Sequence, residues 1–462
     1  MHVACTLERL KHRRRKCTTP LLSLALVVLA STCGRAAHIP ARYRVHAFYY
    51  LWYNEPSTGR WAHWDHAVLP HWDPATAAKY PQGIRFEPPD CLHSPYYPLR
   101  GPYSSTSQEL IRQHLEEMAK YGIGILVASW WGPGWRQGSH DTQLINTDDR
   151  IEQVIREIEA TSSPVRVAFH LEPYEGRTKQ TVHEDLTYLS HKYKDSSAVA
   201  RVNGRILYYV YDSYRLPASD WAELLVRNTG PINVRGTAAD GFFLGLWLEK
   251  DDGDKNIGPG GFDGFYTYFS SEATSYASNP TNWPDLQRWA REHHRIFVPS
   301  LGPGYHDGKI RPWNMAARRE REGIDRYKRL WDTAIALGVH FVSITSYNEW
   351  GEGTQVEPAV PRPMRKDCAY LDYEPHSPFE FLRLTQEGGE RLTAAAEQAA
   401  ADADALRGGD KEGAAEEVEE EDEYADGDDD EDGAGSGSCG GEGAGGGEGG
   451  EEGGGNCGAS GH

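Results

Sequence analysis

Between residues 45 and 350, short apolar, β-prone runs alternate with helix-like stretches, and this alternation restricts the fold more than any other feature. The β-prone runs span residues 45–50, 124–131, 166–173, 205–212, 241–248, 262–269, 295–301 and 340–347. Amphipathic stretches, with apolar residues at three- and four-residue spacing, cover residues 107–121, 149–160, 181–193, 217–227, 283–293 and 317–337. This order predicts an α/β fold with a closed parallel sheet, a (β/α)8 TIM-type barrel.

Two further observations support a single large barrel. No Gly-x-Gly-x-x-Gly motif follows the first β-prone run, so a Rossmann cofactor domain has no support. A chain of 462 residues is also long enough for one barrel together with additional segments. We therefore expect one barrel domain over residues 44–390.

The N-terminal end has the pattern of a targeting segment. A basic cluster at residues 11–16 precedes 18 uncharged residues, 17–34. We expect a signal peptide or signal-anchor segment over residues 1–36 and a short linker over 37–43. Cleavage would give a secreted protein. Retention would give a single-pass membrane protein with a luminal catalytic domain, because the positive flank stays cytoplasmic.

The C-terminal end carries most of the acidic charge. Residues 401–462 contain 21 Asp or Glu and only two basic residues, so nearly all of the net charge of −20 lies there. With few apolar residues to bury, residues 391–462 are expected to form a disordered, acidic, Gly/Glu-rich tail. The body is nearly neutral and offers no basic surface for a nucleic-acid partner. A solvated tail and an interaction or calcium-buffering tail both remain open.

Only two of the seven cysteines, Cys91 and Cys368, fall in the expected barrel domain. They could pair in an oxidising lumen or remain free and buried. The sequence leaves these alternatives open.

Polar and aromatic residues gather where the β-prone runs end, which is the face where barrel enzymes place their chemistry. Glu349 and Glu352 follow the last run in a loop punctuated by glycine, so both can face one cleft. Glycoside cleavage needs two such carboxyl groups, and we predict that these two are catalytic. The predicted substrate-binding residues at the strand ends are Tyr50, Tyr53, Trp130, Trp131, His170, Glu172, Tyr266, Tyr268 and Asn348.

Several ordered motifs resemble one known family, the endo-α-1,2-mannosidases and endomannanases of glycoside hydrolase family 99. The matching segments are residues 45–53, 129–131, 170–174, 264–268, 299–305, 311–314 and 348–355. The resemblance extends from about residue 44 to about residue 385.

The resemblance implies a retaining, endo-acting α-1,2-mannosidase that needs no cofactor. Its substrate would be a mannose-containing oligosaccharide or glycoprotein N-glycan in the Golgi, and it would release glucosylated mannose or a mannose oligosaccharide. Glu349 matches the glutamate that assists the substrate's 2-hydroxyl to form a 1,2-anhydro sugar, and Glu352 matches the acid and base. Glu172 matches a further active-site carboxylate. Gly351 stands where animal members carry His, and Trp131 where they tend to carry Tyr, which leaves the choice of glucose or mannose open.

Other interpretations have less support. A cluster of His and Asp at residues 63–73 suggests a metal, but its spacing matches no standard site, and we expect none. No Gly-x-Ser-x-Gly elbow supports a serine nucleophile. A related barrel enzyme of glycosyltransferase type would need a nucleotide-sugar motif, and none is visible. A catalytically silent carbohydrate-binding protein should have lost a catalytic carboxylate, and both are present.

Overall fold

The computed structural model of the chain describes residues 40–413, except residues 82, 84–85 and 364–367. The expected signal peptide or signal-anchor segment, 1–36, and the tail from 414 to 462 lie outside the described residues. In the described part of the chain, no helix has both the length and the apolar character needed to cross a membrane.

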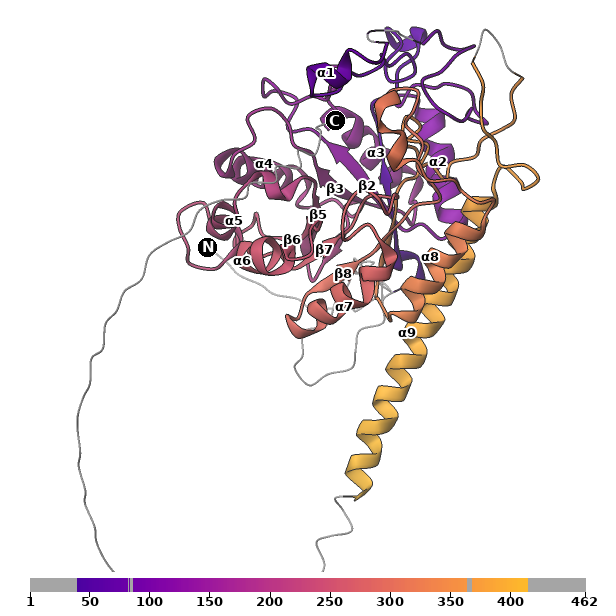
Figure 1. Cartoon of the computed structure of the whole chain (residues 1–462). Helices are drawn as coiled ribbons and strands as arrows, with labels where there is room; N and C mark the ends of the chain where they lie inside the picture. Colours follow the sequence, from indigo (N-terminus) through magenta and orange to yellow (C-terminus); the bar gives the residue numbers. More distant parts are fainter. Residues whose placement is uncertain (1–39, 82, 84–85, 364–367, 414–462) are drawn as a thin grey trace, which may run out of the picture.

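A parallel sheet forms the centre of the molecule, and helices surround it (Figure 1). Neighbouring strands follow the order β8-β7-β6-β5-β3-β2-β1-β10-β9. The strands on this path are β1 (Val45–Tyr49), β2 (Ile125–Trp130), β3 (Arg166–Leu171), β5 (Arg205–Val210), β6 (Gly241–Leu246), β7 (Gly264–Tyr266), β8 (Ile296–Val298), β9 (Ser300–Leu301) and β10 (Val342–Ile344). The short β4 (Arg201–Val202) lies off the path and pairs antiparallel with β5.

The barrel closes through one interrupted segment. β8 pairs with β7 and β9 pairs with β10, and only Pro299 separates β8 from β9. Proline has no N–H to donate to a ladder, although the Pro299 carbonyl accepts a hydrogen bond from Ser343 N–H at 3.0 Å. The run predicted over 295–301 is therefore two short strands. The predicted (β/α)8 TIM-type barrel is confirmed, in a nearly closed form.

Helices connect most of the strands, as the amphipathic stretches predict. The α-helices are α1 (Pro74–Ala77), α2 (Gln108–Lys120), α3 (Asp148–Thr161), α4 (Lys179–Tyr193), α5 (Ala218–Leu225), α6 (Gly258–Gly260), α7 (Trp283–Glu292), α8 (Asp325–Ala336) and α9 (Glu380–Gly413). Shorter turns of helix are η1 (Ala41–Arg44), η2 (Pro56–Thr58), η3 (Ser213–Arg215), η4 (Gly253–Ile257), η5 (Pro280–Asn282) and η6 (Pro312–Ala317). η1 overlaps the expected linker, 37–43.

The helix expected over 317–337 begins later than its apolar pattern indicates. α8 starts at Asp325, because Glu322 and Gly323 have φ angles of 53° and 65°, which a right-handed helix cannot continue through. In the loop before it, Arg319 and Tyr305 pair through their backbones in a short antiparallel bridge. The loop thus belongs to the rim of the barrel.

The boundary expected at residue 390 is also placed too early. α9 runs unbroken to Gly413, packs beside α8, and then extends past the barrel as the long yellow helix of Figure 1. Leu392 and Thr393 are buried in this packing, whereas residues 397–403 are exposed. Apolar side chains in the first part of α9, such as Leu392, therefore hold the helix against the body beyond residue 390.

A disulfide joins Cys91 to Cys368. The sequence left this pairing open because 277 residues separate the two thiols. The bond ties the loop after η2 and α1 to the segment before α9, beside the loop that carries Glu349 and Glu352. It therefore fixes one wall of the carboxyl face of the barrel.

Aromatic side chains fill the upper interior of the barrel. Phe48 packs against His170, Tyr209 and Tyr266, with ring centroids 4.8, 5.4 and 5.6 Å away. All four rings are buried. These close-packed rings fill the barrel interior below the strand ends. They therefore limit how far the side chains at the strand ends can move into the barrel.

Candidate active site

Glu349 and Glu352 lie on one tightly held loop that follows β10. Ser346 organises this loop: its Oγ accepts a hydrogen bond from Glu349 N–H at 2.7 Å and shares another with Thr354 Oγ1 at 2.9 Å. The two glutamates are only 7% and 4% exposed. Two carboxyl groups are thus held in a fixed geometry at the carboxyl end of the barrel, as the sequence predicts.

The two carboxyl groups have different partners. Arg311 Nη1 donates to Glu352 Oε1 at 3.1 Å, and Arg311 also lies 3.4 Å from Asp307 Oδ2. Glu349 Oε2 is buried and has no hydrogen-bond partner among the described residues. Glu352 is therefore held by a cation, while one oxygen of Glu349 is left for a ligand.

Burial raises the pKa of both glutamates. For Glu349 the negative charge of Glu352 raises the pKa further, to well above its usual range, and Arg311 opposes this effect. For Glu352, burial raises the pKa and Arg311 limits the rise. The pair therefore keeps a proton at a pH where exposed glutamates have lost theirs, which suits general acid and base chemistry.

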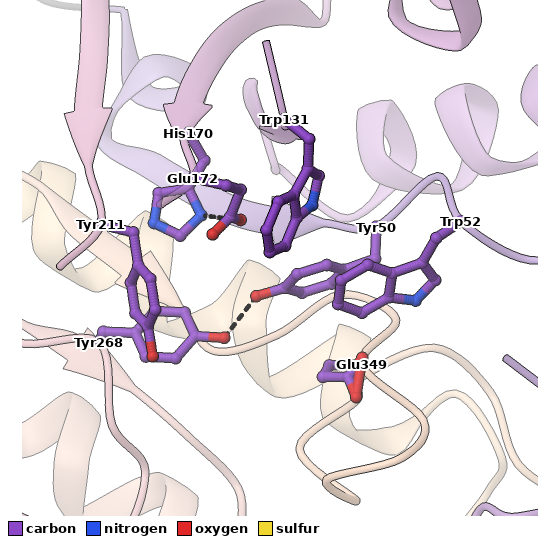
Figure 2. Close-up of a pocket in the computed structure, with 8 residues that line it drawn as sticks. All are labelled: Tyr50, Trp52, Trp131, His170, Glu172, Tyr211, Tyr268 and Glu349. Carbon is purple, nitrogen blue, oxygen red and sulfur yellow. Dashed lines mark hydrogen bonds and ion pairs between the residues drawn. The ribbon is translucent and has the colours of Figure 1, made fainter. Parts of the chain in front are cut away.

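A third carboxylate, Glu172, stands above the end of β3. Its Oε1 accepts a hydrogen bond from Ser129 Oγ at 2.8 Å and lies 3.0 Å from His170 Nδ1. Trp131 Nε1 donates to the same Ser129 Oγ at 3.2 Å. Figure 2 shows Glu172 between His170 and Trp131, so the ends of β2 and β3 together build one wall of the site.

Tyr50 and Tyr268 face each other across the barrel and join through their hydroxyl groups (Figure 2). Tyr268 has a φ of 53°, a conformation that non-glycine residues rarely adopt. Its N–H donates to Ser300 Oγ at 2.7 Å, and its carbonyl accepts from Thr345 Oγ1 at 2.6 Å. The surrounding loops thus hold the ring of Tyr268 in the site.

Two adjoining cavities open among these residues. A hollow of about 10 Å³ is lined by Tyr50, Trp52, Trp131, His170, Glu172, Tyr211, Tyr268 and Glu349. A larger cavity of about 480 Å³ includes Glu352, Arg311, Tyr305, Trp72 and Trp313 in its lining. Tyr211 lines both cavities. Glu349 therefore faces the narrow space, and Glu352 faces the wide one.

Five of the predicted substrate-binding residues, Tyr50, Trp131, His170, Glu172 and Tyr268, line the hollow. The other four are not among the residues lining either cavity, and all four are fully buried. These four are Tyr53, Trp130, Tyr266 and Asn348.

Each of these four side chains supports a wall instead. The side chain of Asn348 bonds both the N–H and the carbonyl of Tyr50, at 2.7 and 2.9 Å. Trp130 Nε1 donates to Asp148 Oδ1, and the Tyr53 hydroxyl donates to the Asn348 carbonyl, both at 2.9 Å. Tyr266 shares a hydrogen bond with His170 Nε2 at 2.9 Å. Their positions in the sequence did not distinguish these four supporting residues from the residues that line the hollow.

Sequence reasoning missed Trp52, Tyr211 and Arg311 as site residues. Tyr211 directly follows β5, so the strand-end rule identifies it once it is applied to that strand. Trp52 and Arg311 lie inside two of the matching motifs, 45–53 and 311–314. Arg311 directly precedes η6, outside the barrel strands, and only the folded loop brings it to Glu352.

The His and Asp cluster at residues 63–73 has other partners. His63 Nε2 lies 2.7 Å from Asp141 Oδ2, and its ring stacks on Trp52 with a centroid distance of 4.5 Å. Asp73 caps α1 by accepting from Thr76 N–H at 2.9 Å. Across residues 40–413, apart from the gaps given above, no group of three or more His, Cys, Asp or Glu side chains is placed to hold a metal ion.

A parallel barrel with a buried carboxyl pair on the loop after its last strand defines a glycoside hydrolase. Residues 40–394 match the family model described as Glycosyl hydrolase family 99. The chain belongs to this family.

Two curated relatives and one solved structure agree with the family match. The chain is 40% identical over 362 residues to a human glycoprotein endo-alpha-1,2-mannosidase-like protein, with 77% of each chain covered. It is 39% identical over 360 residues to a rat glycoprotein endo-alpha-1,2-mannosidase, covering 77% of this chain and 76% of the other. The structure of the GH99 endo-alpha-mannosidase from Bacteroides thetaiotaomicron matches with a TM-score of 0.68 and 36% identity, over 76% of this chain and 98% of that one.

Proposed function

We propose that this enzyme cleaves internal α-1,2-mannosidic bonds of N-glycan-type oligosaccharides with retention of configuration, through a 1,2-anhydro sugar. The observation that carries the proposal is the pair Glu349 and Glu352, buried on one loop but facing two different cavities. The names of the relatives, endo-alpha-1,2-mannosidase and its like, indicate the substrate class.

The two cavities suggest which part of the substrate each glutamate acts on. The hollow beside Glu349 has about the volume of one water or hydroxyl group, which suits the 2-hydroxyl of the cleaved mannose. The cavity beside Glu352 has room for the leaving oligosaccharide. Trp72 and Trp313, with ring centroids 5.2 Å apart, offer aromatic faces on that side on which a sugar ring can pack.

In the first step, the Glu349 carboxylate accepts the proton of the 2-hydroxyl while that oxygen attacks C1. The bond from C1 to the leaving oxygen breaks, and Glu352 donates its proton to that oxygen. In the second step, water attacks C1 and gives a proton to Glu352, the bond from C1 to the 2-oxygen breaks, and Glu349 returns its proton to that oxygen. Two inversions give net retention. The internal nucleophile is already fixed on the ring, so little orientational freedom is lost.

The reaction needs one proton on the carboxyl pair at the start. Burial raises the pKa of both groups, and the negative charge of Glu352 raises the pKa of Glu349 further, so a proton stays on the pair at a pH where exposed glutamates have lost theirs. The pair titrates as a unit. Its acid and base are therefore assigned by the position of the substrate and not by which glutamate holds the proton in the empty site.

We place the enzyme in the secretory pathway, in the Golgi membrane if the N-terminal segment is retained and outside the cell if it is cleaved. The Cys91–Cys368 disulfide supports an oxidising compartment. Immunolocalisation and carbonate extraction of membranes from expressing cells would test this placement. Extraction of the full-length protein into the soluble fraction would contradict membrane anchoring.

The test of the reaction is to incubate the enzyme with glucosylated and non-glucosylated high-mannose glycans and to identify the released sugar. An endo-acting enzyme releases glucosylated mannose, or a mannose oligosaccharide, in one piece. Release of single monosaccharides would contradict endo cleavage. The matched control is Glu349→Gln/Glu352→Gln, in which no sugar should be released.

A further inference from the structure

His93 lies against the catalytic loop at a point where that loop has no side chain. A Cβ atom placed on Gly351 would lie 2.8 Å from His93 Nε2 and 3.0 Å from Glu349 Oε1. The imidazole and the carboxylate therefore border the same small space, on either side of Gly351. His93 comes from the loop that follows η2 and α1, far from Gly351 in the sequence.

The backbone does not explain the glycine at position 351. The φ angle of Gly351 lies outside the left-handed region, so its backbone accepts an L side chain without strain. In contrast, Gly353, two residues later, has a φ of 63°. The ring of His93 and Oε1 of Glu349 together leave no room for a side chain at 351.

His93 is firmly held in this place. It is 2% exposed, its backbone N–H donates to the Trp64 carbonyl at 3.2 Å, and its ring lies edge-on to Trp64 with a centroid distance of 6.2 Å. The disulfide at Cys91 anchors the same loop two residues earlier. Burial, followed by the nearby His66, His63 and Lys309, lowers the pKa of His93 well below its usual range, so the ring is neutral.

A neutral ring beside Glu349 has a definite consequence for that carboxyl group. It borders the space beside Oε1 without adding a positive charge that would compete with Arg311 for the carboxyl pair. Oε2 is then the oxygen left without a partner among the described residues, available to the substrate's 2-hydroxyl. A small rotation of the carboxyl group would misalign this proton transfer.

We propose that His93 is a positioning residue for Glu349, and that side chains at positions 93 and 351 are alternative occupants of one space beside its carboxylate. This inference rests on the proposed role of Glu349 as the group that assists the 2-hydroxyl. It predicts that the imidazole can be supplied from either position, but not from both together.

Four variants test the inference on a high-mannose glycan, with kcat and KM measured separately. His93→Ala should lower kcat by about 10- to 100-fold with KM little changed, because the substrate still binds but Glu349 is misaligned. Gly351→His should lose activity, because two rings then compete for one space. His93→Ala/Gly351→His should recover much of the lost kcat. His183→Ala, which removes a half-buried imidazole from α4, should match wild type.

Thermal melting shows whether each variant is folded, and His93→Gln provides a second substitution if His93→Ala melts early. Wild-type kcat in a folded His93→Ala, or a double variant no better than the worse single variant, would overturn the positioning role. Endo cleavage by the wild-type enzyme is measured in the same assay. Its absence would count against the proposed function, and its presence with unaffected variants would count against His93 alone.

Discussion

Arg311 Nη1 lies 3.1 Å from Oε1 of Glu352, and the two groups are 7% and 4% exposed. A guanidinium held this close keeps the pKa of Glu352 lower than burial alone would make it. The structure thus sets the acid strength of Glu352 through the residue that precedes η6, outside the barrel strands.

Arg311→Met should shift the basic limb of the pH profile of kcat/KM to higher pH. Glu352 must be protonated to act as the acid, and loss of the cation raises its pKa, so the protonated form persists at higher pH. The expected shift is about one pH unit or more. Arg311→Lys keeps the charge and should shift the limb less. A limb that moves to lower pH in Arg311→Met would contradict the assignment.

Glu352→Gln should lower turnover by about 10²- to 10⁴-fold while sugar binding survives, because the amide cannot donate the proton to the leaving oxygen. Kinetics on a glycan and calorimetric binding to the same glycan would measure the two effects. A substrate with a good leaving group needs less protonation in the first step and should be less affected. Near-normal turnover of the glycan by this variant would remove Glu352 from the role of acid.

A substrate that lacks the 2-hydroxyl at the cleaved mannose should bind but scarcely react. Assistance by Glu349 requires that hydroxyl as the nucleophile, so no sugar should become attached to the protein. Intact-protein mass spectrometry during turnover would test this. A mass increase of one glycosyl unit mapped to Glu349 would refute the anhydro-sugar route, while the glycosidase assignment would stand.

Removing the disulfide by Cys91→Ser/Cys368→Ser should lower the free energy of unfolding by about 2 to 5 kcal/mol. The crosslink closes a long segment of chain, 277 residues, and so constrains the unfolded state. Chemical denaturation of the wild type and the double variant would give the difference. Equal midpoints and slopes in the two curves would show that the bond is dispensable for stability.

Ending the chain at residue 396 should leave the melting temperature unchanged, because the described side chains that this removes, residues 397–403 of α9, are exposed. Ending it at residue 390 should destabilise the body by about 2 kcal/mol or more, since Leu392 is buried to 1% exposure. Calorimetry on both truncated chains would separate the two cases. A large loss on ending at 396 would mean that the chain beyond that residue contributes to the stability of the body.

The predicted strands and helices match the structure where apolar residues keep one periodicity along the whole segment. The run at 124–131 is β2 and the stretch at 107–121 is α2, whose N-cap, Ser107, accepts from Leu110 N–H. The predictions fail where the backbone interrupts the pattern. Pro299 divides one strand, and Glu322 with Gly323 delays α8. The start of the tail was misplaced because apolar residues such as Leu392 are too few to dominate a composition that is otherwise acidic and Gly-rich.

That Glu349 and Glu352 lie together was predictable, because they are three residues apart on one loop directly after a strand. Strand ends also located Tyr50, Trp131, His170, Glu172 and Tyr268. The same rule did not distinguish residues that line the hollow from residues such as Tyr266 and Asn348 that support it. Both kinds are polar or aromatic, and both follow strands.

The sequence by itself determined the barrel, the family and the carboxyl pair, because these depend on periodicity and on residues that are close in the chain. Only the tertiary structure decided the Cys91–Cys368 bond, the cation at Glu352 and the imidazole beside Gly351. Each of these brings together groups from distant segments. The distance between such groups is set by how the loops pack above the barrel. That packing cannot be predicted from residue type or from spacing along the chain.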